Sequence, residues 1–293
     1  MDVKTIRIIK ASSPDREGHL HGRISELEQA GFNVLFDEIQ PNQDWTWTAG
    51  SVGDRARALN QALLEPESDA VMWARGGYGA SELLDLIDWH AVRNAKAKPI
   101  IGFSDVCAAQ SALYTLTGRN SVHGPMPATS TWAKSGREEI DDLVAILKGR
   151  KTSGTFTLRA FGNDRKLING PLFGGCLSVL TSLIGTKYLP TSLDGHILYF
   201  EDISENPGRV IRMMNQWAQS GHFKNVPAII LGSFKDLGGH LPDNADVLFN
   251  EIYARYKIPV FHSPLFGHST PNLPLVLGCL GIIENNQLRW SIS

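Results

Sequence analysis

The stretch Lys98-Pro99-Ile100-Ile101-Gly102-Phe103-Ser104-Asp105-Val106 places a serine where an apolar strand ends and a helix begins. At such a turn the Ser104 hydroxyl stands clear of its neighbours, and the backbone N–H of Asp105 points the same way and can bind an oxyanion. Hydrolytic α/β enzymes expose their nucleophile in this way. The stretch lacks the last glycine of the Gly-x-Ser-x-Gly form, however, and a serine at a helix start is commonly an N-cap. Local sequence leaves both interpretations open.

The pattern around this stretch predicts a parallel, Rossmann-like sheet with helices on both faces. Short apolar runs alternate with amphipathic stretches, the βαβ pattern. The apolar runs lie at 6–9, 34–36, 70–73 and 99–103. Of the four helical stretches, the first ends at residue 30, the second spans 54–64, the third follows residue 79 and the fourth spans 105–116. Because sites in such sheets lie at the carboxyl ends of strands, we expect Arg75-Gly76-Gly77-Tyr78-Gly79 and Ser104 on the same rim.

The alternation of apolar runs and amphipathic stretches is interrupted in the middle of the chain, which predicts two lobes. We expect an amino-terminal α/β domain over 1–132, a connecting segment over 133–166 and a mixed α/β domain over 167–293. The connection contains a polar helix near 138–147, a basic turn at 148–151 and a loop near 162–164. The second domain is expected to start its first unit at 168 and to contain strands at 196–200 and 228–234, helices at 176–184, 209–217 and within 243–256, and closing strands near 276–283 and 287–292.

Composition excludes several classes of protein. The 293 residues carry a formal net charge of −2, which offers no general attraction to nucleic acid. Three cysteines at 107, 176 and 279 indicate neither a disulfide framework nor a cysteine-type zinc site, and a reducing cytoplasm fits them. The first apolar run is too short for a signal peptide, and no stretch approaches ~18 uninterrupted apolar residues. We expect neither export nor a membrane span.

A nucleophilic serine needs a histidine to accept its proton and an acid to orient that histidine. His268 follows a short strand in a loop rich in Gly, Pro and Asn, which suits a positioned base. His123, near another strand end, is the second candidate, with a loop-stabilising role as its alternative. Glu201 closes an apolar strand and is the candidate acid, or else a capping or surface carboxylate. The order Ser104, Glu201, His268 is that of the α/β-hydrolases, although the geometry recurs on unrelated folds.

The glycine-rich loop after residue 75 supplies a second candidate for oxyanion binding. Its glycines let the backbone approach a ligand, so the N–H of Gly77 could act beside that of Asp105, unless the loop is only a tight turn. The Gly-x-x-x-x-Gly-Lys phosphate loop and the His-Glu-x-x-His zinc helix are both absent from the sequence. We therefore expect no metal and no cofactor. Cys107 and Cys176 are better explained as small packed side chains than as nucleophiles.

Taken together, several fragments in one order over nearly the whole chain resemble the LD-carboxypeptidase family of serine peptidases. The Arg-Gly-Gly-Tyr-Gly and Gly-Phe-Ser-Asp fragments are the most specific. The fragments are Gly53-Asp54-Arg55-Ala56, Trp73-Ala74-Arg75-Gly76-Gly77-Tyr78-Gly79-Ala80, Ile101-Gly102-Phe103-Ser104-Asp105, His123-Gly124-Pro125-Met126, Gly174-Gly175, Phe200-Glu201-Asp202 and Phe266-Gly267-His268-Ser269.

The resemblance implies a catalytic triad divided between two lobes, with the active site between them. Ser104 would come from the amino-terminal lobe, and Glu201 and His268 from the carboxy-terminal lobe. Members look like cytoplasmic homodimers that remove the terminal D-alanine from murein tetrapeptides during peptidoglycan recycling, cutting after an L-centre on lysine or diaminopimelate. A related branch hydrolyses microcin C-type peptide-nucleotide antibiotics.

Some positions depart from the family pattern and leave the substrate open. Cys176 replaces an asparagine, Val106-Cys107 replaces an Ile-Thr type pair, and Gly208 and Ile211 replace a tyrosine and an aspartate. Arg75 could bind a carboxylate but is expected to brace its own turn. Two further classes stay open: a non-catalytic muropeptide- or sugar-binding protein, and a nucleotide-dependent oxidoreductase that rests only on the glycine-rich loop and the α/β pattern.

Overall fold

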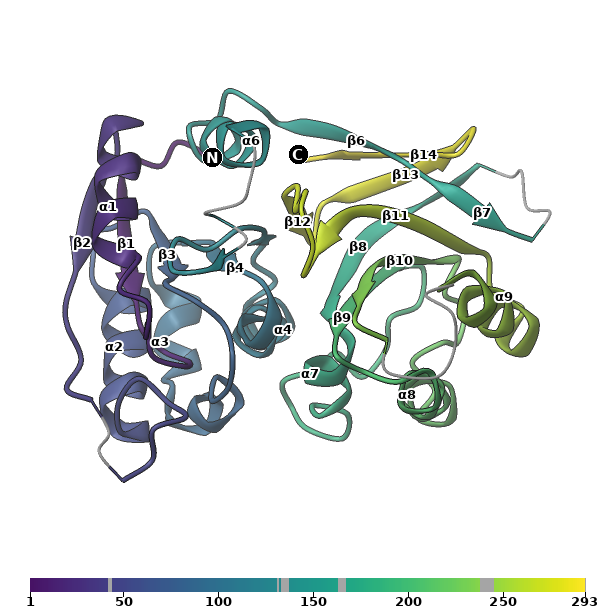
Figure 1. Cartoon of the computed structure of the whole chain (residues 1–293), viewed down its shortest axis with the longest axis horizontal. Coiled ribbons are helices and arrows are strands. Elements are labelled where there is room, and N and C mark those ends of the chain that lie inside the picture. Colours follow the sequence, from purple (N-terminus) through teal and green to yellow (C-terminus); the bar gives the residue numbers. More distant parts are fainter. Residues whose placement is uncertain (42–43, 131, 133–136, 163–166, 238–244, 293) are drawn as a thin grey trace.

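The structure is a computed structural model that describes residues 1–41, 44–130, 132, 137–162, 167–237 and 245–292. It contains a six-stranded sheet and an eight-stranded sheet, which we call the cores of the amino-terminal and carboxy-terminal lobes (Figure 1). The expected α/β architecture of two lobes is confirmed. None of the helices in the described part of the chain combines the length and apolar character needed to cross a bilayer.

The amino-terminal lobe is a doubly wound sheet. Its strand order is β12-β5-β4-β3-β1-β2, and β1 to β5 run parallel. The order reverses between β1 and β3, and in such sheets ligands bind at the carboxyl ends of the strands beside this reversal. Its elements are β1 (Thr5–Ile9), α1 (Leu20–Gln29), β2 (Asn33–Phe36), α2 (Val52–Leu64), β3 (Ala70–Trp73), the 3-10 helix η1 (Ser81–Leu86), α3 (Trp89–Asn94), β4 (Ile100–Gly102), the 3-10 turn η2 (Ser104–Val106), α4 (Cys107–Thr117), β5 (Ser121–His123) and α6 (Arg137–Leu147).

The helix expected after residue 79 is the short 3-10 helix η1. A new helix, α3, begins only two residues beyond its end, because the Asp88 side chain accepts the N–H of Ala91 and caps it.

The carboxy-terminal lobe is a mixed sheet with the order β6-β14-β13-β8-β9-β10-β11-β7. Its central strands β8 to β11 run parallel, and the flanking pairs are antiparallel. Only Leu158 separates the two edge strands β6 and β7, so the sheet curls until its edges meet. Its elements are β6 (Ser153–Thr157), β7 (Arg159–Phe161), β8 (Ile168–Cys176), α7 (Leu177–Thr181), β9 (Ile197–Ile203), α8 (Pro207–Gln219), β10 (Ala228–Lys235), α9 (Ala245–Tyr256), β11 (Val260–Gly267), β13 (Leu280–Glu284) and β14 (Gln287–Ser291).

The strands β6 and β7 lie inside the segment that was expected to be only a connection, and the sequence pattern does not predict them. Both are short, half-exposed edge strands, so they lack the continuous apolar run of a central strand. Residues 163–164 of the loop expected near 162–164, and residues 243–244 of the helix expected within 243–256, lie outside the described residues.

The strand expected near 276–283 divides between the two sheets. Its first part, β12 (Leu275–Leu277), pairs antiparallel with β5 and so completes the amino-terminal sheet. Gly278 then turns with a positive φ of 87°, and β13 continues into the other sheet. In Figure 1, β12 lies between the lobes.

Helix α4 joins the lobes through a shared core. One buried apolar cluster contains Leu113 of α4 together with Phe173 and Leu180 of the carboxy-terminal lobe. Across the same interface the Ser111 hydroxyl donates to the Tyr188 carbonyl oxygen at 2.7 Å. Since the turn η2, which starts at Ser104, leads directly into α4, this packing holds the end of β4 against the carboxy-terminal sheet.

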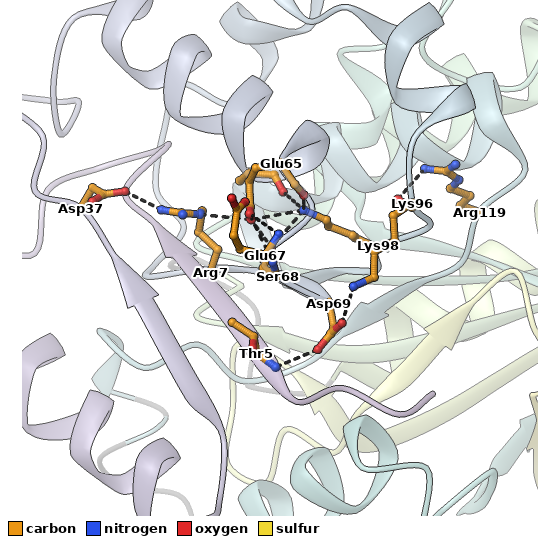
Figure 2. A network of polar contacts seen from close by, with 11 residues as sticks. Thr5, Arg7, Asp37, Glu65, Glu67, Ser68, Asp69, Lys96, Lys98 and Arg119 are labelled. Carbon is orange, nitrogen blue, oxygen red and sulfur yellow. Dashed lines mark hydrogen bonds and ion pairs between the residues drawn. The ribbon is translucent and has the colours of Figure 1, made fainter.

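A polar network anchors the other end of β4 (Figure 2). Lys98 is buried, and its ammonium donates to the carbonyl oxygen of Ala62 at 2.8 Å and to Ser68 Oγ at 3.0 Å. It also pairs with Glu65 at 3.2 Å, which contacts Arg7 of β1 at 3.3 Å. Burial alone would raise the pKa of Glu65, but hydrogen bonds from its neighbours and from Lys98 outweigh it and lower that pKa.

Candidate active site

Ser104 occupies a strained turn between β4 and α4. Its φ is 65°, a left-handed conformation that costs a non-glycine residue about 1–2 kcal/mol. The preceding strand ends at Gly102, where an added Cβ would lie 3.0 Å from both Met126 Sδ and Val106 Cγ2. A strained strand-to-helix turn of this kind presents a nucleophile at the top of the sheet. Ser104 lines a pocket of about 430 Å³.

The glycine-rich loop after β3 lies directly beside Ser104. An added Cβ at Gly76 would be 2.8 Å from Ser104 Cβ and 3.0 Å from its Oγ. Gly77 has a φ of 115°, and a Cβ there would lie 2.2 Å from the Ser13 hydroxyl. That hydroxyl accepts the backbone N–H of Tyr78 at 3.1 Å. Only glycines permit this approach, so the loop backbone faces the pocket that contains Ser104.

Asp105 ties this loop to the turn from behind. Its buried carboxylate accepts the Ser12 hydroxyl at 2.5 Å and the backbone N–H of Ala80 at 2.8 Å. Burial raises the pKa of Asp105, and these hydrogen bonds oppose the rise. Its side chain therefore braces three strand ends. Its backbone N–H, at the start of a helical turn, has no intrahelical acceptor.

Glu201 and His268 form a close pair. Oε2 of Glu201 lies 2.6 Å from Nδ1 of His268, and Glu201 has no exposed surface. Since an ionised carboxylate only accepts, Nδ1 carries the proton and Nε2 is left free to receive one. Burial alone would lower the pKa of His268, but the charge and hydrogen bond of Glu201 outweigh it and raise that pKa. Burial likewise opposes ionisation of Glu201, yet the interactions with His268 lower its pKa.

The backbone that delivers His268 requires a glycine before it. Gly267 has a φ of 112°, and an added Cβ would lie 2.8 Å from Glu201 Cβ. Its N–H donates to Asn272 Oδ1 at 2.9 Å, which fixes the loop. The Phe103 ring packs edge-on against the His268 ring, with centroids 4.9 Å apart. These contacts hold the imidazole at the wall of the pocket.

The pocket brings together three of the five predicted site residues. Ser104, Gly77 and His268 line it, Glu201 lies behind His268, and Asp105 lies behind Ser104. Among the described residues, no hydrogen bond joins the Ser104 hydroxyl to the His268 ring. Apo enzymes commonly show such loose contacts, which tighten when substrate binds.

His123, the second candidate base, is buried behind Glu201 and does not line the pocket. Its ring centroid lies 5.9 Å from that of Phe103 and 5.7 Å from that of Tyr199. Burial lowers the pKa of His123 to about 4, so the ring is neutral at pH 7. Its position near a strand end marked it in the sequence, but no local signal indicated its burial.

The departures from the family pattern lie away from the pocket lining. The backbone N–H of Cys176 donates to Cys107 Sγ at 3.2 Å, and both thiols are buried. Burial raises the pKa of both, which keeps them protonated. Gly208 and Ile211 belong to α8 and are also absent from the pocket lining. Within the described chain, no group of three or more His, Cys, Asp or Glu side chains could hold a metal ion.

Two family models match this chain. Residues 6–124 match the family model described as the LD-carboxypeptidase N-terminal domain, and residues 169–282 match the LD-carboxypeptidase C-terminal domain. The chain belongs to the LD-carboxypeptidase family. The resemblance that the sequence fragments indicated is thereby confirmed, and so is its coarse functional class, a carboxypeptidase-type hydrolase.

Individual members of the LD-carboxypeptidase family match most of the chain. The murein tetrapeptide carboxypeptidase of Pseudomonas aeruginosa is 31% identical, over 84% of this chain and 82% of its own. The microcin C7 self-immunity protein MccF of Escherichia coli is 27% identical, over 91% of this chain and 86% of its own. The crystal structure of muramoyltetrapeptide carboxypeptidase from Oxalobacter formigenes superposes with a TM-score of 0.85 at 25% identity, covering 99% of each chain.

Proposed function

We propose that this LD-carboxypeptidase family member is a serine carboxypeptidase that cleaves an L,D-peptide bond and releases terminal D-alanine from murein tetrapeptides. The observation that carries the proposal is the convergence of Ser104 and His268 on one pocket, with Glu201 hydrogen-bonded behind the imidazole. The relative from Pseudomonas aeruginosa, named for the same substrate class, supports it. The role would be cytoplasmic peptidoglycan recycling, carried out by a homodimer.

The first half of the reaction is acylation. His268 accepts the proton of Ser104 at Nε2 as the hydroxyl oxygen attacks the scissile carbonyl carbon, and Glu201 stabilises the imidazolium that forms. The backbone N–H groups of Gly77 and Asp105 bind the oxyanion of the tetrahedral intermediate. His268 then gives its proton to the nitrogen of the leaving D-alanine, the C–N bond breaks, and an acyl-enzyme ester remains on Ser104.

Water completes the cycle by the reverse route. His268 takes a proton from water as its oxygen attacks the ester carbonyl, and the proton returns to Ser104 as the ester C–O bond breaks. These steps use only side chains and backbone groups of this chain. The free acid of the shortened peptide and D-alanine are the products.

The direct test is Ser104→Ala with a tetrapeptide that ends in D-alanine after an L-centre. We expect D-alanine release, followed by mass spectrometry, to fall at least about 10³-fold, because removal of a triad serine costs up to ~10⁶ in turnover. A serine-directed phosphonate should label the wild-type protein at Ser104 and leave the variant unlabelled. Turnover by Ser104→Ala at the wild-type rate would refute the proposed nucleophile.

A second candidate function is hydrolysis of a peptide-nucleotide amide. The relationship to the microcin C7 self-immunity protein MccF favours it. The chemistry at Ser104 would be the same. Offering both substrate types to the purified protein separates the two functions, whereas tight peptide binding with neither turnover nor labelling would indicate a non-catalytic binding protein.

A further inference from the structure

The pocket that contains Ser104 is lined by two basic side chains, Arg75 and Lys235, and by one acid, Glu17. The carboxylate of Glu17 lies 2.8 Å from Nε2 of His19, a residue that does not line the pocket. A carboxypeptidase substrate carries at least one free carboxylate close to the bond that is cut. The two cations are therefore the groups to compare as its binding partners.

Arg75 is tied to the neighbouring loop that follows β1. Its guanidinium donates from Nη1 to the carbonyl oxygen of Pro14 at 3.1 Å, and its Nε is buried without a partner among the described residues. A guanidinium held in this way braces the turn before Gly76.

Lys235 is placed differently. It is the last residue of β10, which lies between β9 and β11, the strands that carry Glu201 and lead to His268. Two contacts fix its backbone. Lys235 pairs with Ile203 in the sheet, and its carbonyl oxygen accepts the N–H of Ser204 at 2.9 Å. The side chain thus projects from a rigid strand end into the rim of the pocket.

The ammonium of Lys235 is close to the base and has no side-chain partner among the described residues. Within the part of the chain that the structure describes, it forms neither an ion pair nor a hydrogen bond. Its positive charge acts on His268, where it opposes protonation of the ring. An exposed, unpaired cation beside the reacting groups is free to pair with an anion on the ligand.

We propose that Lys235 binds a carboxylate of the substrate and so determines specificity. This inference rests on the proposed function, because it assigns a substrate group to the same pocket. Two carboxylates have the required chemistry: the α-carboxylate of the terminal D-residue, and the side-chain carboxylate that distinguishes diaminopimelate from lysine. The ammonium acts in binding and takes no part in the proton transfers.

The test compares Lys235→Met with Lys224→Met, a matched change at an exposed lysine in the same lobe outside the pocket lining. Three peptides are used: a lysine tetrapeptide ending in D-alanine, the same peptide ending in D-alaninamide, and the diaminopimelate tetrapeptide ending in D-alanine. Loss of one charge-assisted hydrogen bond that is equal in ground state and transition state raises KM and spares kcat. We expect Lys235→Met to raise KM about 10-fold and Lys224→Met to change nothing.

The peptides identify which carboxylate is bound. If Lys235 binds the terminal α-carboxylate, the wild type discriminates against the peptide that ends in D-alaninamide, and Lys235→Met does not. If it binds the side-chain carboxylate, the wild type prefers the diaminopimelate peptide and Lys235→Met removes the preference. Lys235→Arg should restore most of the binding in either case. An unchanged KM in Lys235→Met, or an equal loss on peptides with and without the carboxylate, would overturn the proposal.

Binding to an inactive background separates this proposal from the proposed function. Calorimetric titration of Ser104→Ala and of Ser104→Ala combined with Lys235→Met needs no turnover. If the wild type releases no D-alanine but the carboxylate-dependent difference in Kd persists, the proposed function fails and the role of Lys235 stands. If release occurs and the Kd values are equal, Lys235 has no such role.

Discussion

Glu201, which has no exposed surface, lies 2.6 Å from the Nδ1 atom of His268. Its other oxygen, Oε1, has no hydrogen-bond partner within the described residues. A buried carboxylate is costly unless it is paired, so the charge of Glu201 depends on the imidazole beside it. A change in either residue should therefore alter both the catalytic role and the pKa of the other.

We expect Glu201→Gln to lower kcat by about 10²–10⁴, because loss of the orienting carboxylate leaves the imidazole in the wrong tautomer. The pKa that governs the acid limb of kcat/KM should also fall, since burial then acts on His268 without the opposing charge. Rate profiles between pH 5 and 9 measure both effects. Glu251→Gln, at an exposed carboxylate paired with Arg255, should behave as wild type. An unshifted acid limb in Glu201→Gln would argue against the coupling.

The wild-type enzyme should lose activity on the acid side at a pH above 6.5. His268 must be neutral to accept a proton, and Glu201 raises its folded-state pKa above the ordinary value of 6.5. The pair stabilises the fold most between pH 4.5 and 6.5, where the lowered pKa of Glu201 and the raised pKa of His268 both favour the ionised pair. An acid limb below pH 6 would contradict this assignment.

Ser104→Gly should be about 1 kcal/mol more stable to unfolding than Ser104→Ala, although both lack the nucleophile. Glycine adopts a φ of 65° without strain, whereas alanine does not. Urea denaturation of the two variants gives the difference. The same pair of changes at Ser182, an exposed serine with a φ of −65°, should favour alanine instead. Equal stabilities at position 104 would mean that the turn stores no strain.

Gly76→Ala should lower kcat/KM about 100-fold, because the new methyl group would lie 2.8 Å from Ser104 Cβ and displace the nucleophile. Overpacking should also destabilise the fold by about 1–3 kcal/mol. Steady-state kinetics and thermal unfolding measure the two effects. The control is Gly22→Ala in α1, where nothing lies within 4 Å of the new Cβ and helix propensity favours alanine. Full activity in Gly76→Ala would show that the loop yields without moving Ser104.

His123→Gln should remove part of the acid sensitivity of the fold. Burial lowers the pKa of His123 to about 4, while the unfolded chain binds a proton near 6.5. Stability is therefore lost as pH falls from about 6.5 to 4, by roughly 3 kcal/mol for a shift of this size. Urea titrations at pH 7.5 and 4.5 should show a smaller loss in the variant. His90→Gln, at an exposed position on α3, should keep the wild-type loss.

The amino-terminal sheet could be predicted because its signals are local. β3 is buried at every position and α2 has a polar outer face, so the order of apolar runs in the sequence predicts the βαβ pattern. The edge strands β6 and β7 carry no such signal, because an edge strand is defined by what it pairs with. The transfer of β12 to the other sheet likewise depends on a partner 150 residues away, β5.

Sequence by itself determined the strand-to-helix turn at Ser104, the glycines that permit close backbone approach, the order of the lobes and the family. These depend on residue type and on spacing over a few positions, which act through local sterics and apolar periodicity. Only tertiary structure decided that Glu201 meets His268, that His123 is buried behind them and that Lys235 reaches the pocket with no side-chain partner in the part of the chain that is described. Such relations arise when distant strand ends pack into one edge, and burial and charge then set their chemistry.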